Sequence, residues 1–546
     1  MLISNRLPHI GATAPASARS LPSASSGATP INLQDQFARS NSNHAGSIPL
    51  LSLRAPEKTE PATLKAAVES GVPNPMPAPA DPKLRDWRDD TIYFVMTDRF
   101  KDADPSNNHG ADKSDIHAWH GGDFQGLIDK ADYIRGTGAT ALWITPPMDS
   151  QQRFVDTEGY HGYWPVDYYK VDEHLGDMEK FKELVDVYHD KGMKVIVDIP
   201  LNHVAWEHPL WTDPNKASLF HHNGDVTDWD NDWQQENCSI FGLPDWAQEN
   251  PETEKYLMEV GEFWAKTGID GFRLDAVRSV PKWFWEKFNN RMHEVAGDDF
   301  LLLGEYYHGD AARLAPYQSD TDMDSLVDYP MYYRIKETFA KGGSMREVAN
   351  GMSWTNNTYK DPELMGIFAD NHDTQRFLTE AGDDKDRLKM ALAFVMTTNR
   401  IPTIYYGSEQ SFTSDKTGWA ETSRKDMVFD KDPEMHGFFQ KLGAIRNDLE
   451  PLRRGELLEM WQDDQVYAFD RKSEHGEAIV VFNNAETEQH RAMPLRAESK
   501  LQDGTVLKDL LSERTVTVKD GRIEQNLPAK SAGIFVPLPE SKATVA

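Results

Sequence analysis

One eight-residue stretch, Gly271–Arg278 with the sequence GFRLDAVR, sets an arginine and a carboxylate between bulky apolar residues. Successive side chains of a β-strand point to opposite faces, so Phe272 and Leu274 share one face while Arg273 and Asp275 share the other. The pattern is typical of a strand in a closed barrel, with the charged pair at the mouth where barrel enzymes keep their chemistry. On this segment alone, an ordinary strand end with a structural ion pair explains the residues equally well.

Acidic residues close several of the predicted strands. They are Asp198, Asp275 and Glu305, with Asp370 and Asp373 after the seventh strand. Carboxylates gathered at one face of a barrel, with no Cys or Lys nucleophile in place, suit cleavage of a glycosidic bond. That reaction needs one carboxylate to attack or to activate water and another to protonate the leaving oxygen. His203 and His372 lie on the loops just beyond, where a neutral imidazole can donate to a sugar hydroxyl.

A catalytic metal site is the alternative interpretation of these residues, because Asp and His together can bind zinc or another divalent ion. The residues lie on different predicted strands and show neither HxxxH nor HxH spacing. The pattern therefore favours acid–base chemistry over metal catalysis.

From about residue 85, short apolar runs alternate with helical patterns. Strands are predicted at 91–97, 141–145, 194–198, 271–275 and 300–305, with weaker candidates near 325–328, 366–370 and 402–406. Apolar residues at helical spacing separate them, for example over 124–136, 181–188 and 256–264. Eight short strands that are apolar on both faces predict an α/β fold, a (β/α)8 TIM barrel, over residues 85–451.

Two segments fall outside this alternation. Residues 202–250, between the third and fourth strands, are dense in Asp, Asn, Trp and His, and we expect them to form a small excursion domain over the barrel mouth. Residues 452–546 contain short β runs separated by charged turns. Such runs predict a C-terminal antiparallel β-sandwich domain.

The composition narrows the classes of partner. There are 88 Asp and Glu residues against 58 Lys and Arg, a formal net charge of −30. An acidic chain disfavours nucleic acid and anionic membrane surfaces and fits a neutral ligand.

The single cysteine, Cys238, rules out an intrachain disulfide and a cysteine metal cluster. No apolar run approaches the roughly 18 residues of a membrane span. The oligomeric state stays open.

Residues 1–84 differ in composition from everything after them. They are rich in Ser, Ala and Pro and carry no acidic residue before Asp35, so we expect a disordered extension. The segment lacks the apolar core of a secretory signal, whereas its acid-poor, Ser-rich start is typical of organelle transit peptides. It is also similar to the N-termini of bacterial effectors exported without a cleaved signal. The localisation therefore stays open between the cytoplasm and export or targeting through this tail.

Short blocks at the predicted strand ends resemble, in order, those of the alpha-amylase family of glycoside hydrolases, which includes the cyclodextrin glucanotransferases. The resemblance runs from about Tyr93 to about Pro537. One block alone is a weak signal, but six in order on predicted strand ends are specific. The blocks are Asp198–His203, Leu243–Trp246, Gly271–Arg278, Gly304–Glu305, Phe368–Asp373 and Gly407–Glu409.

The resemblance implies a role for each matching residue. It makes Asp275 the nucleophile, Glu305 the general acid/base and Asp373 the residue that orients sugar hydroxyls and favours ring distortion. A nucleophilic carboxylate paired with an acid/base would give retention of anomeric configuration. Tyr163 would stack on the sugar, and His203 and His372 would hydrogen-bond its hydroxyls. Arg273 would keep Asp275 ionised. Arg278 is the remaining implied substrate-binding residue.

A second constellation, the loop that begins at Asp102, alternates Asp and Asn residues, whose oxygens suit the hard calcium ion. A solvated turn explains the same residue types. The loop resembles the calcium loop of cyclodextrin glucanotransferases and related amylases, which implies a Ca²⁺ cofactor. The implied ligand positions are Asp102, Asp104, Asn107, Asn108, Gly121 and Asp123.

The sequence also departs from the family pattern. A further calcium site of the family uses an Asn, an Asp and a His, and here Asn202 and Asp245 are present while Ser279 stands at the His position. The glucanotransferases carry starch-binding domains after the sandwich that this chain is too short to hold, which favours hydrolysis over cyclisation.

Three functions remain. The first is a hydrolase of α-1,4-glucosidic bonds in starch-like α-glucans or maltooligosaccharides. The second is an α-glucan glycosyltransferase of the same fold. The third, a non-catalytic barrel that binds a glycan or a partner, predicts the loss of a catalytic carboxylate, yet Asp275, Glu305 and Asp373 are all present.

Overall fold

A computed structural model describes Pro82 and residues 85–415 and 420–538. The predicted N-terminal extension, apart from Pro82, lies outside the described residues. Within them, no helix is both long enough and apolar enough to cross a membrane.

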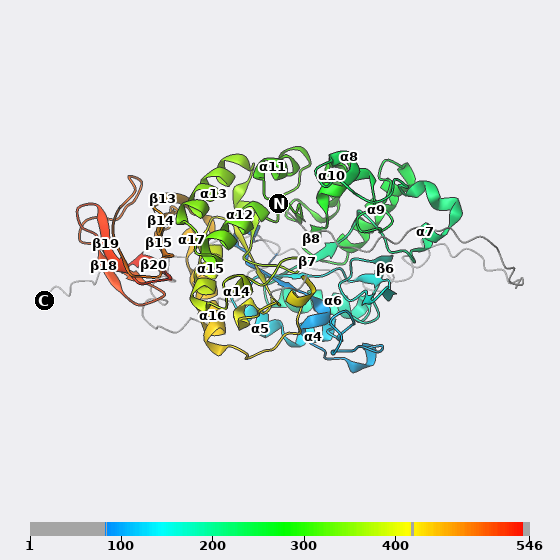
Figure 1. Ribbon diagram of the computed structural model, residues 1–546, viewed down its shortest axis with the longest axis horizontal. Helices are drawn as coiled ribbons and strands as arrows, with labels where there is room; N and C mark the ends of the chain where they lie inside the picture. Colours follow the sequence, from blue (N-terminus) through cyan, green and yellow to red (C-terminus); the bar gives the residue numbers. More distant parts are fainter. Residues whose placement is uncertain (1–81, 83–84, 416–419, 539–546) are drawn as a thin grey trace, which may run out of the picture. The chain divides into compact units, whose positions relative to one another are not determined.

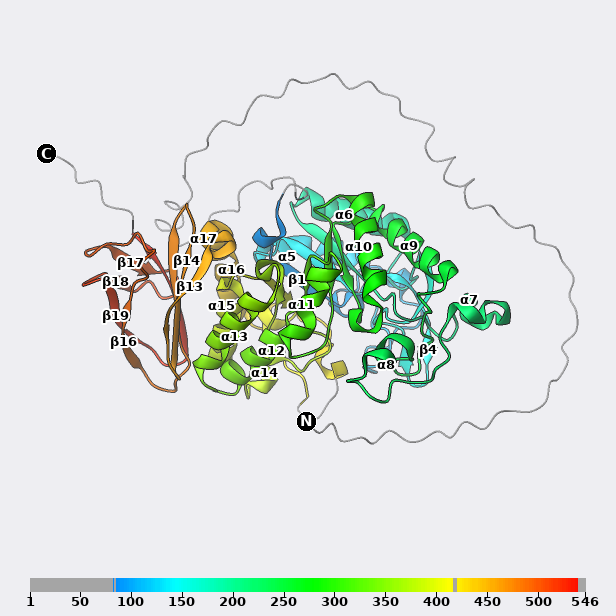
Figure 2. The ribbon, with the colours of Figure 1, turned by 90° about the horizontal axis from the view of Figure 1, so that it is seen from above.

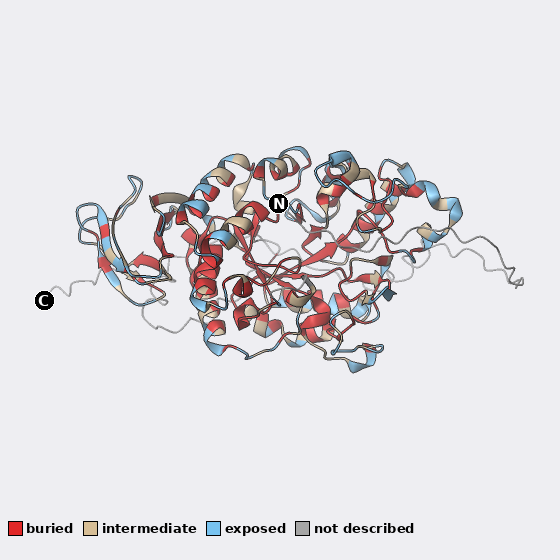
Figure 3. Ribbon diagram, viewed as in Figure 1, coloured by how far each residue is buried: buried red, intermediate tan, exposed pale blue. Residues whose placement is uncertain are grey.

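Eight parallel strands form the central sheet, in the order β10-β9-β8-β7-β2-β1-β12-β11. A parallel bridge between Val327 and Gly366 joins its two outer strands and closes the barrel. The strands are buried, as Figure 3 shows, because helices cover the outside and side chains fill the inside. Their bounds are β1 (Ile92–Val95), β2 (Ala141–Ile144), β7 (Lys194–Ile199), β8 (Gly271–Leu274), β9 (Leu301–Gly304), β10 (Ser325–Leu326), β11 (Gly366–Ile367) and β12 (Ile401–Tyr405).

Helices connect and flank these strands (Figure 1), and their starts follow local capping rules. In α9, for example, the Asn250 side chain accepts from the Glu252 N–H, Pro251 occupies the first turn, and Glu254 adds a second acidic side chain near the helix N-terminus. The helices are α4 (Phe124–Asp129), α5 (Ala131–Gly136), α6 (Met178–Asp190), α9 (Pro251–Ala265), α10 (Lys282–Ala296), α11 (Ala311–Asp320), α12 (Tyr329–Ile335), α13 (Met345–Thr358), α14 (Phe377–Glu380), α15 (Lys385–Thr397), α16 (Pro433–Asp448) and α17 (Glu450–Arg454).

The excursion between β7 and β8 is mostly irregular, with short helices at α7 (Pro209–Thr212) and α8 (Asp232–Asn237). Trp246 anchors it, because this side chain is fully buried and stacks on Phe220. Before the excursion, β6 (Pro165–Val171) pairs with β3 (Met148–Ser150), and β4 (Arg153–Phe154) forms a small hairpin with β5 (Thr157–Glu158).

The C-terminal part is antiparallel β-structure that packs against α13, α15 and α17 (Figure 2). One sheet has the order β13-β14-β15-β20-β17-β18, and a second pairs β16 with β19. The predicted fold class, a (β/α)8 barrel with a C-terminal β domain, is confirmed. The strands are β13 (Glu456–Gln462), β14 (Val466–Lys472), β15 (Glu477–Asn483), β16 (Gln489–Pro494), β17 (Val506–Asp509), β18 (Thr515–Thr517), β19 (Arg522–Leu527) and β20 (Ser531–Pro537).

Candidate active site

A buried guanidinium, that of Arg273 on β8, organises the carboxylates at the barrel mouth. Its side chain is 1% exposed, and its Nη1 donates to Asp198 Oδ1 at 3.0 Å and also to Asp275 Oδ1. Its Nη2 lies 3.7 Å from Glu305 Oε2. Three strand ends therefore converge on one cation, as the alternation along β8 predicts. Asp198 and Asp275 hold the guanidinium through hydrogen bonds, and Glu305 lies close to it.

Glu305 sits where a carboxyl group is held in its protonated form. Burial raises its pKa to about 8, the Arg273 guanidinium opposes that shift, and the neighbouring Asp275 and Asp373 carboxylates add to it. Its Oε2 accepts the Ala276 N–H at 3.2 Å. Ala276 has a φ of +47°, a left-handed conformation that costs a residue with a Cβ about 1 kcal/mol or more. The strained turn after β8 thus aims a backbone N–H at the acid.

Asp373 lies on the loop after β11, beside a residue that the sequence motifs did not reveal. Arg424 Nη2 donates to Asp373 Oδ1 at 3.1 Å, and Arg424 Nε donates to the His372 carbonyl at 2.9 Å. Burial would raise the pKa of Asp373, but His372, Arg424 and Arg273 together hold it below its usual value. Asp373 is therefore ionised at neutral pH while Glu305 keeps its proton.

Tyr163 links two of these groups through its hydroxyl. The hydroxyl donates to Asp198 Oδ2 at 2.8 Å and lies 2.9 Å from His372 Nε2. Burial lowers the pKa of His372 to about 3, so its imidazole is neutral. Burial also lowers the pKa of His203, whose Nε2 contacts the Tyr163 carbonyl oxygen at 3.0 Å. The structure thus brings Tyr163, His203 and His372 together at the carboxylate cluster.

Arg278 lies apart from the carboxylate cluster. Its Nη2 pairs with Asp232 of the excursion helix α8 at 3.3 Å, and its guanidinium lies over the Tyr306 ring, 5.5 Å from the centroid. Tyr306 follows Glu305 directly, so Arg278 borders the site from the excursion side. Its predicted contact with substrate stays a prediction.

The loop predicted to hold calcium contains amide oxygens without partners. Asn107 Oδ1 and Asn108 Oδ1 are both buried and accept no hydrogen bond. Asp102 Oδ2 accepts from Asn108 Nδ2 at 3.3 Å, and Asp123 Oδ2 accepts from two loop N–H groups. Gly121 has a φ of +85°, and a Cβ there would lie 2.4 Å from Asn108 Oδ1. The Asp104 carboxylate instead accepts from Ser106 and is turned outward.

A second group of polar atoms joins the excursion to the barrel. A terminal atom of the Asn202 side-chain amide lies 2.7 Å from the Ser279 carbonyl oxygen and 3.2 Å from Asp245 Oδ1. If that atom is nitrogen, it donates to both; if it is oxygen, three oxygens converge as around a cation. The backbone of Ser279, not its side chain, supplies its oxygen. Asp245 Oδ2 forms a hydrogen bond of 2.7 Å with His221 Nδ1.

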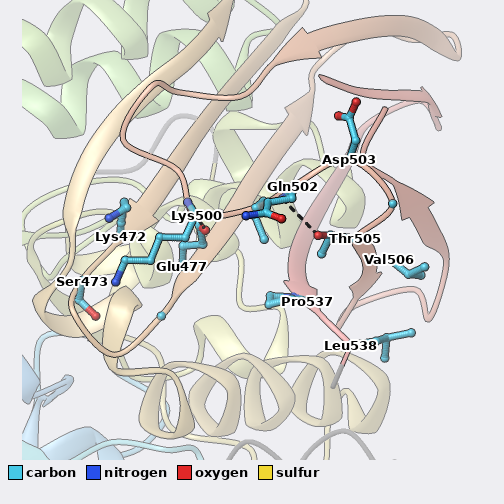
Figure 4. Close-up of a pocket in the computed structure, with 13 residues that line it drawn as sticks. Lys472, Ser473, Glu477, Lys500, Gln502, Asp503, Thr505, Val506, Pro537 and Leu538 are labelled. Atoms are coloured by element: carbon cyan, nitrogen blue, oxygen red, sulfur yellow. Dashed lines mark hydrogen bonds between the residues drawn. The ribbon is translucent and has the colours of Figure 1, made fainter. Parts of the chain in front are cut away.

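The C-terminal domain has a hollow of its own, of about 870 Å³, between the β14–β15 turn and residues 500–506 (Figure 4). Its lining includes two carboxyl groups, those of Glu477 and Asp503, but no aromatic ring and no arginine. Its cations are the lysines Lys472 and Lys500, so no guanidinium joins its two carboxyl groups as one does at the barrel mouth.

A barrel mouth that gathers carboxyl groups around one guanidinium, with one of those groups keeping its proton, has the proton donor and the further carboxyl group that glycoside hydrolysis requires. The fold and the site together define a glycoside hydrolase. Residues 94–472 match the family model "Alpha amylase, catalytic domain". The chain belongs to the alpha-amylase family.

Relatives agree with this assignment. The chain is 39% identical over 474 residues to a beta/alpha-amylase of Paenibacillus polymyxa, covering 82% of this chain and 38% of that protein. It thus spans less than half the length of that relative. The crystal structure of an Anoxybacillus alpha-amylase is 38% identical, with a TM-score of 0.78, and the match covers 84% of this chain and 99% of that one.

One structural neighbour bears on the choice between hydrolysis and transfer. A structure described as CldA, "the first cyclomaltodextrin glucanotransferase with a three-domain ABC distribution", is 29% identical, with a TM-score of 0.75, over 82% of this chain and 98% of that chain. A glucanotransferase without further domains therefore exists. Starch-binding domains therefore do not separate transfer from hydrolysis.

Proposed function

We propose that the protein cleaves α-1,4-glucosidic bonds of starch-like α-glucans or maltooligosaccharides with retention of anomeric configuration. One observation carries the proposal: Arg273 contacts both Asp275 and Glu305, and burial raises the pKa of Glu305 to about 8. A carboxyl group that keeps its proton, held at one cation beside a second carboxyl group, supplies a proton donor and a nucleophile.

In the first step, Asp275 Oδ attacks the anomeric carbon while Glu305 gives its proton to the glycosidic oxygen, whose bond to that carbon breaks. In the second step, the Glu305 carboxylate takes a proton from water, the water oxygen bonds to the anomeric carbon, and the Asp275 ester bond breaks. Asp373, ionised beside Arg424, accepts hydrogen bonds from sugar hydroxyls.

Products should be followed over time from soluble starch and from maltoheptaose, with the wild type beside Glu305→Gln. The proposal expects short linear maltooligosaccharides with new reducing ends, and a fall in kcat of about 10³-fold or more in the variant, because the proton donor is gone. Products longer than maltoheptaose without matching reducing ends would identify a transferase instead. No turnover of either sugar by the wild type would sink the proposal.

We also propose calcium as a structural cofactor. The two unpartnered amide oxygens of Asn107 and Asn108, beside Asp102, fit a hard cation, and so do the Asn202, Asp245 and Ser279 oxygens. Among the described residues no three His, Cys, Asp or Glu side chains gather as a metal site. These sites would instead rely on amide and carbonyl oxygens. A bound cation would cross-link loop segments and would take no part in the chemistry.

Metal analysis of protein purified in calcium buffer tests this proposal. Two calcium ions per chain are expected, with one lost in Asn108→Leu and the other in Asp245→Asn. Chelation should lower Tm, because a ligand at about 100 times its Kd stabilises by about 2.7 kcal/mol. A single ion that survives Asp245→Asn would mean that the Asn202 amide nitrogen faces Asp245. No bound calcium and an unchanged Tm would refute both sites.

A further inference from the structure

Exposed aromatic side chains gather on the excursion and on the neighbouring β4–β5 hairpin. Large hydrophobic side chains exposed elsewhere among the described residues are scattered, as on a typical soluble surface. Exposed aromatic rings that lie close together typically mark a binding surface, whereas a single exposed ring needs no such explanation. The group comprises Phe154, Trp206, Trp229, Trp233 and Phe241, together with the aliphatic Val155.

Two of these rings, Phe154 on the hairpin and Trp206 on the excursion, form a matched pair. Their planes are 13° apart and their centroids 6.4 Å apart, so the two rings lie nearly parallel. Phe154 is 37% exposed and Trp206 38% exposed. The two come from segments far apart in the sequence, which makes a shared orientation a product of the fold.

The backbone beside both rings is joined by the side chain of Gln151, which is 5% exposed. Its Nε2 donates to the Arg153 carbonyl at 3.0 Å, and its Oε1 accepts the Glu207 N–H at 3.3 Å. One buried amide thereby fixes the backbone next to both rings. Arg153 and Glu158, paired at 3.1 Å, close the hairpin further. Rings on a fixed backbone bind at a lower entropic cost.

Ring contacts lead from the pair to the catalytic cluster. The Phe154 ring meets Trp164 edge-on at 5.9 Å, and Trp164 meets His161 edge-on at 4.5 Å. The His161 ring lies 5.8 Å from that of Tyr163, whose hydroxyl donates a hydrogen bond to Asp198. On the other side, Gly242 lies against Trp206, and a Cβ there would be 3.8 Å from the indole Cζ2. An extended ligand bound at the carboxylates could therefore continue over the two rings.

The chemistry of this surface fits a neutral sugar chain. The C–H faces of a pyranose ring pack on aromatic faces, and carboxylates nearby accept hydrogen bonds from its hydroxyl groups. The excursion presents the exposed acidic side chain of Glu207, and the chain carries a net charge of −30, which opposes nucleic acid and other anions.

We propose that Phe154 and Trp206 form an aromatic platform that binds the α-glucan chain at sugar units away from the bond that is cleaved. This inference rests on the proposed function. The platform adds affinity for long chains, whereas a short substrate that ends before the platform gains nothing from it.

Steady-state kinetics of the double variant Phe154→Ala/Trp206→Ala test the platform, with amylose and a 4-nitrophenyl α-maltotrioside as substrates. The ratio of kcat/KM on amylose to kcat/KM on the maltotrioside should fall about tenfold, through KM on amylose. Trp283→Ala is the matched control, because that ring is also 37% exposed but lies on α10. An unchanged ratio in the double variant, or an equal fall in the control, would overturn the proposal.

Binding measured without turnover separates this inference from the proposed function. Calorimetry of Glu305→Gln with maltoheptaose should show affinity that falls about tenfold when both platform residues are also alanine. A wild type that turns over no α-glucan would refute the proposed function, while the calorimetry would still decide the platform. Equal maltoheptaose affinity with and without the two rings would refute the platform even in an active enzyme.

Discussion

Two regions of this molecule bury guanidinium groups, and they use them in opposite ways. At the barrel mouth, Arg273 faces three carboxylates. At the junction of the barrel with the C-terminal domain, the hydrogen-bond acceptors of Arg446 and Arg471 are backbone carbonyls. The same side chain therefore serves as a counter-ion in one place and as a set of fixed donors in the other.

The carbonyls that Arg471 contacts include two at the C-terminal ends of helices. Arg471 on β14 donates to the carbonyls of Thr397, the last residue of α15, and of Leu452 in α17 at 2.6 and 2.9 Å. The last carbonyls of a helix lack intrahelical partners and carry the negative end of its dipole. A forked cation satisfies several of them at once.

The electrostatic consequences differ accordingly. Burial lowers the pKa of Arg446 to about 9, and Arg453 nearby adds to the shift, because no carboxylate neutralises it directly. At the mouth, burial acts the same way on Arg273, but Asp198, Asp275 and Glu305 raise its pKa well above the usual value. The charge of Arg273 thus acts on the catalytic carboxyl groups, whereas Arg446 and Arg471 hold the barrel and the C-terminal domain together.

Arg273→Lys should produce the largest effect. A lysine keeps the positive charge but cannot present two nitrogens to two acids, so Asp275 and Glu305 lose their common partner. We expect kcat to fall about 10³-fold, comparable to losing a fixed charge partner in a catalytic site. Steady-state kinetics on maltoheptaose measure this, with circular dichroism as the check on folding. A variant with near-normal kcat would mean that Arg273 is only structural.

Arg471→Met should act on stability instead. It removes the hydrogen bonds that this guanidinium gives to three carbonyls in a buried junction, and we expect the free energy of unfolding to fall by about 3 kcal/mol. Urea unfolding of wild type and variant gives the difference, with the exposed Arg496→Met as the matched control. kcat per folded molecule should stay within about twofold. A large loss of kcat at full stability would contradict the separation of the two regions.

The pH dependence of kcat/KM sharpens the comparison at the mouth. Glu305 must carry its proton to act, and its pKa is raised to about 8. Activity should therefore be present below that pH and be lost as pH rises through about 8. In Asp373→Asn the pH at which the residual activity is lost on the basic side should fall, because one carboxylate that raises the Glu305 pKa is gone. An unchanged upper pH limit in the variant would exclude this coupling between Asp373 and Glu305.

Much of the site could be predicted because it follows strand periodicity. Arg273, Asp275 and Glu305 sit at the ends of short apolar runs, and parallel strands bring such ends to one face. Arg424 and Gln151 could not be found this way, since each reaches its partners from an irregular segment with no period or motif. Arg446 and Arg471 look like surface arginines in the sequence, because their acceptors are carbonyls from distant segments.

The most direct test of Asp275 as the nucleophile is to trap the covalent intermediate. Wild-type protein is incubated with a slow 5-fluoro-α-maltosyl fluoride, and the labelled peptide is identified by mass spectrometry. We predict the sugar mass on the peptide that contains Asp275, with the ester on that side chain. A label on Asp198 or Asp373, or no label together with release of a product of inverted configuration, would contradict this mechanism.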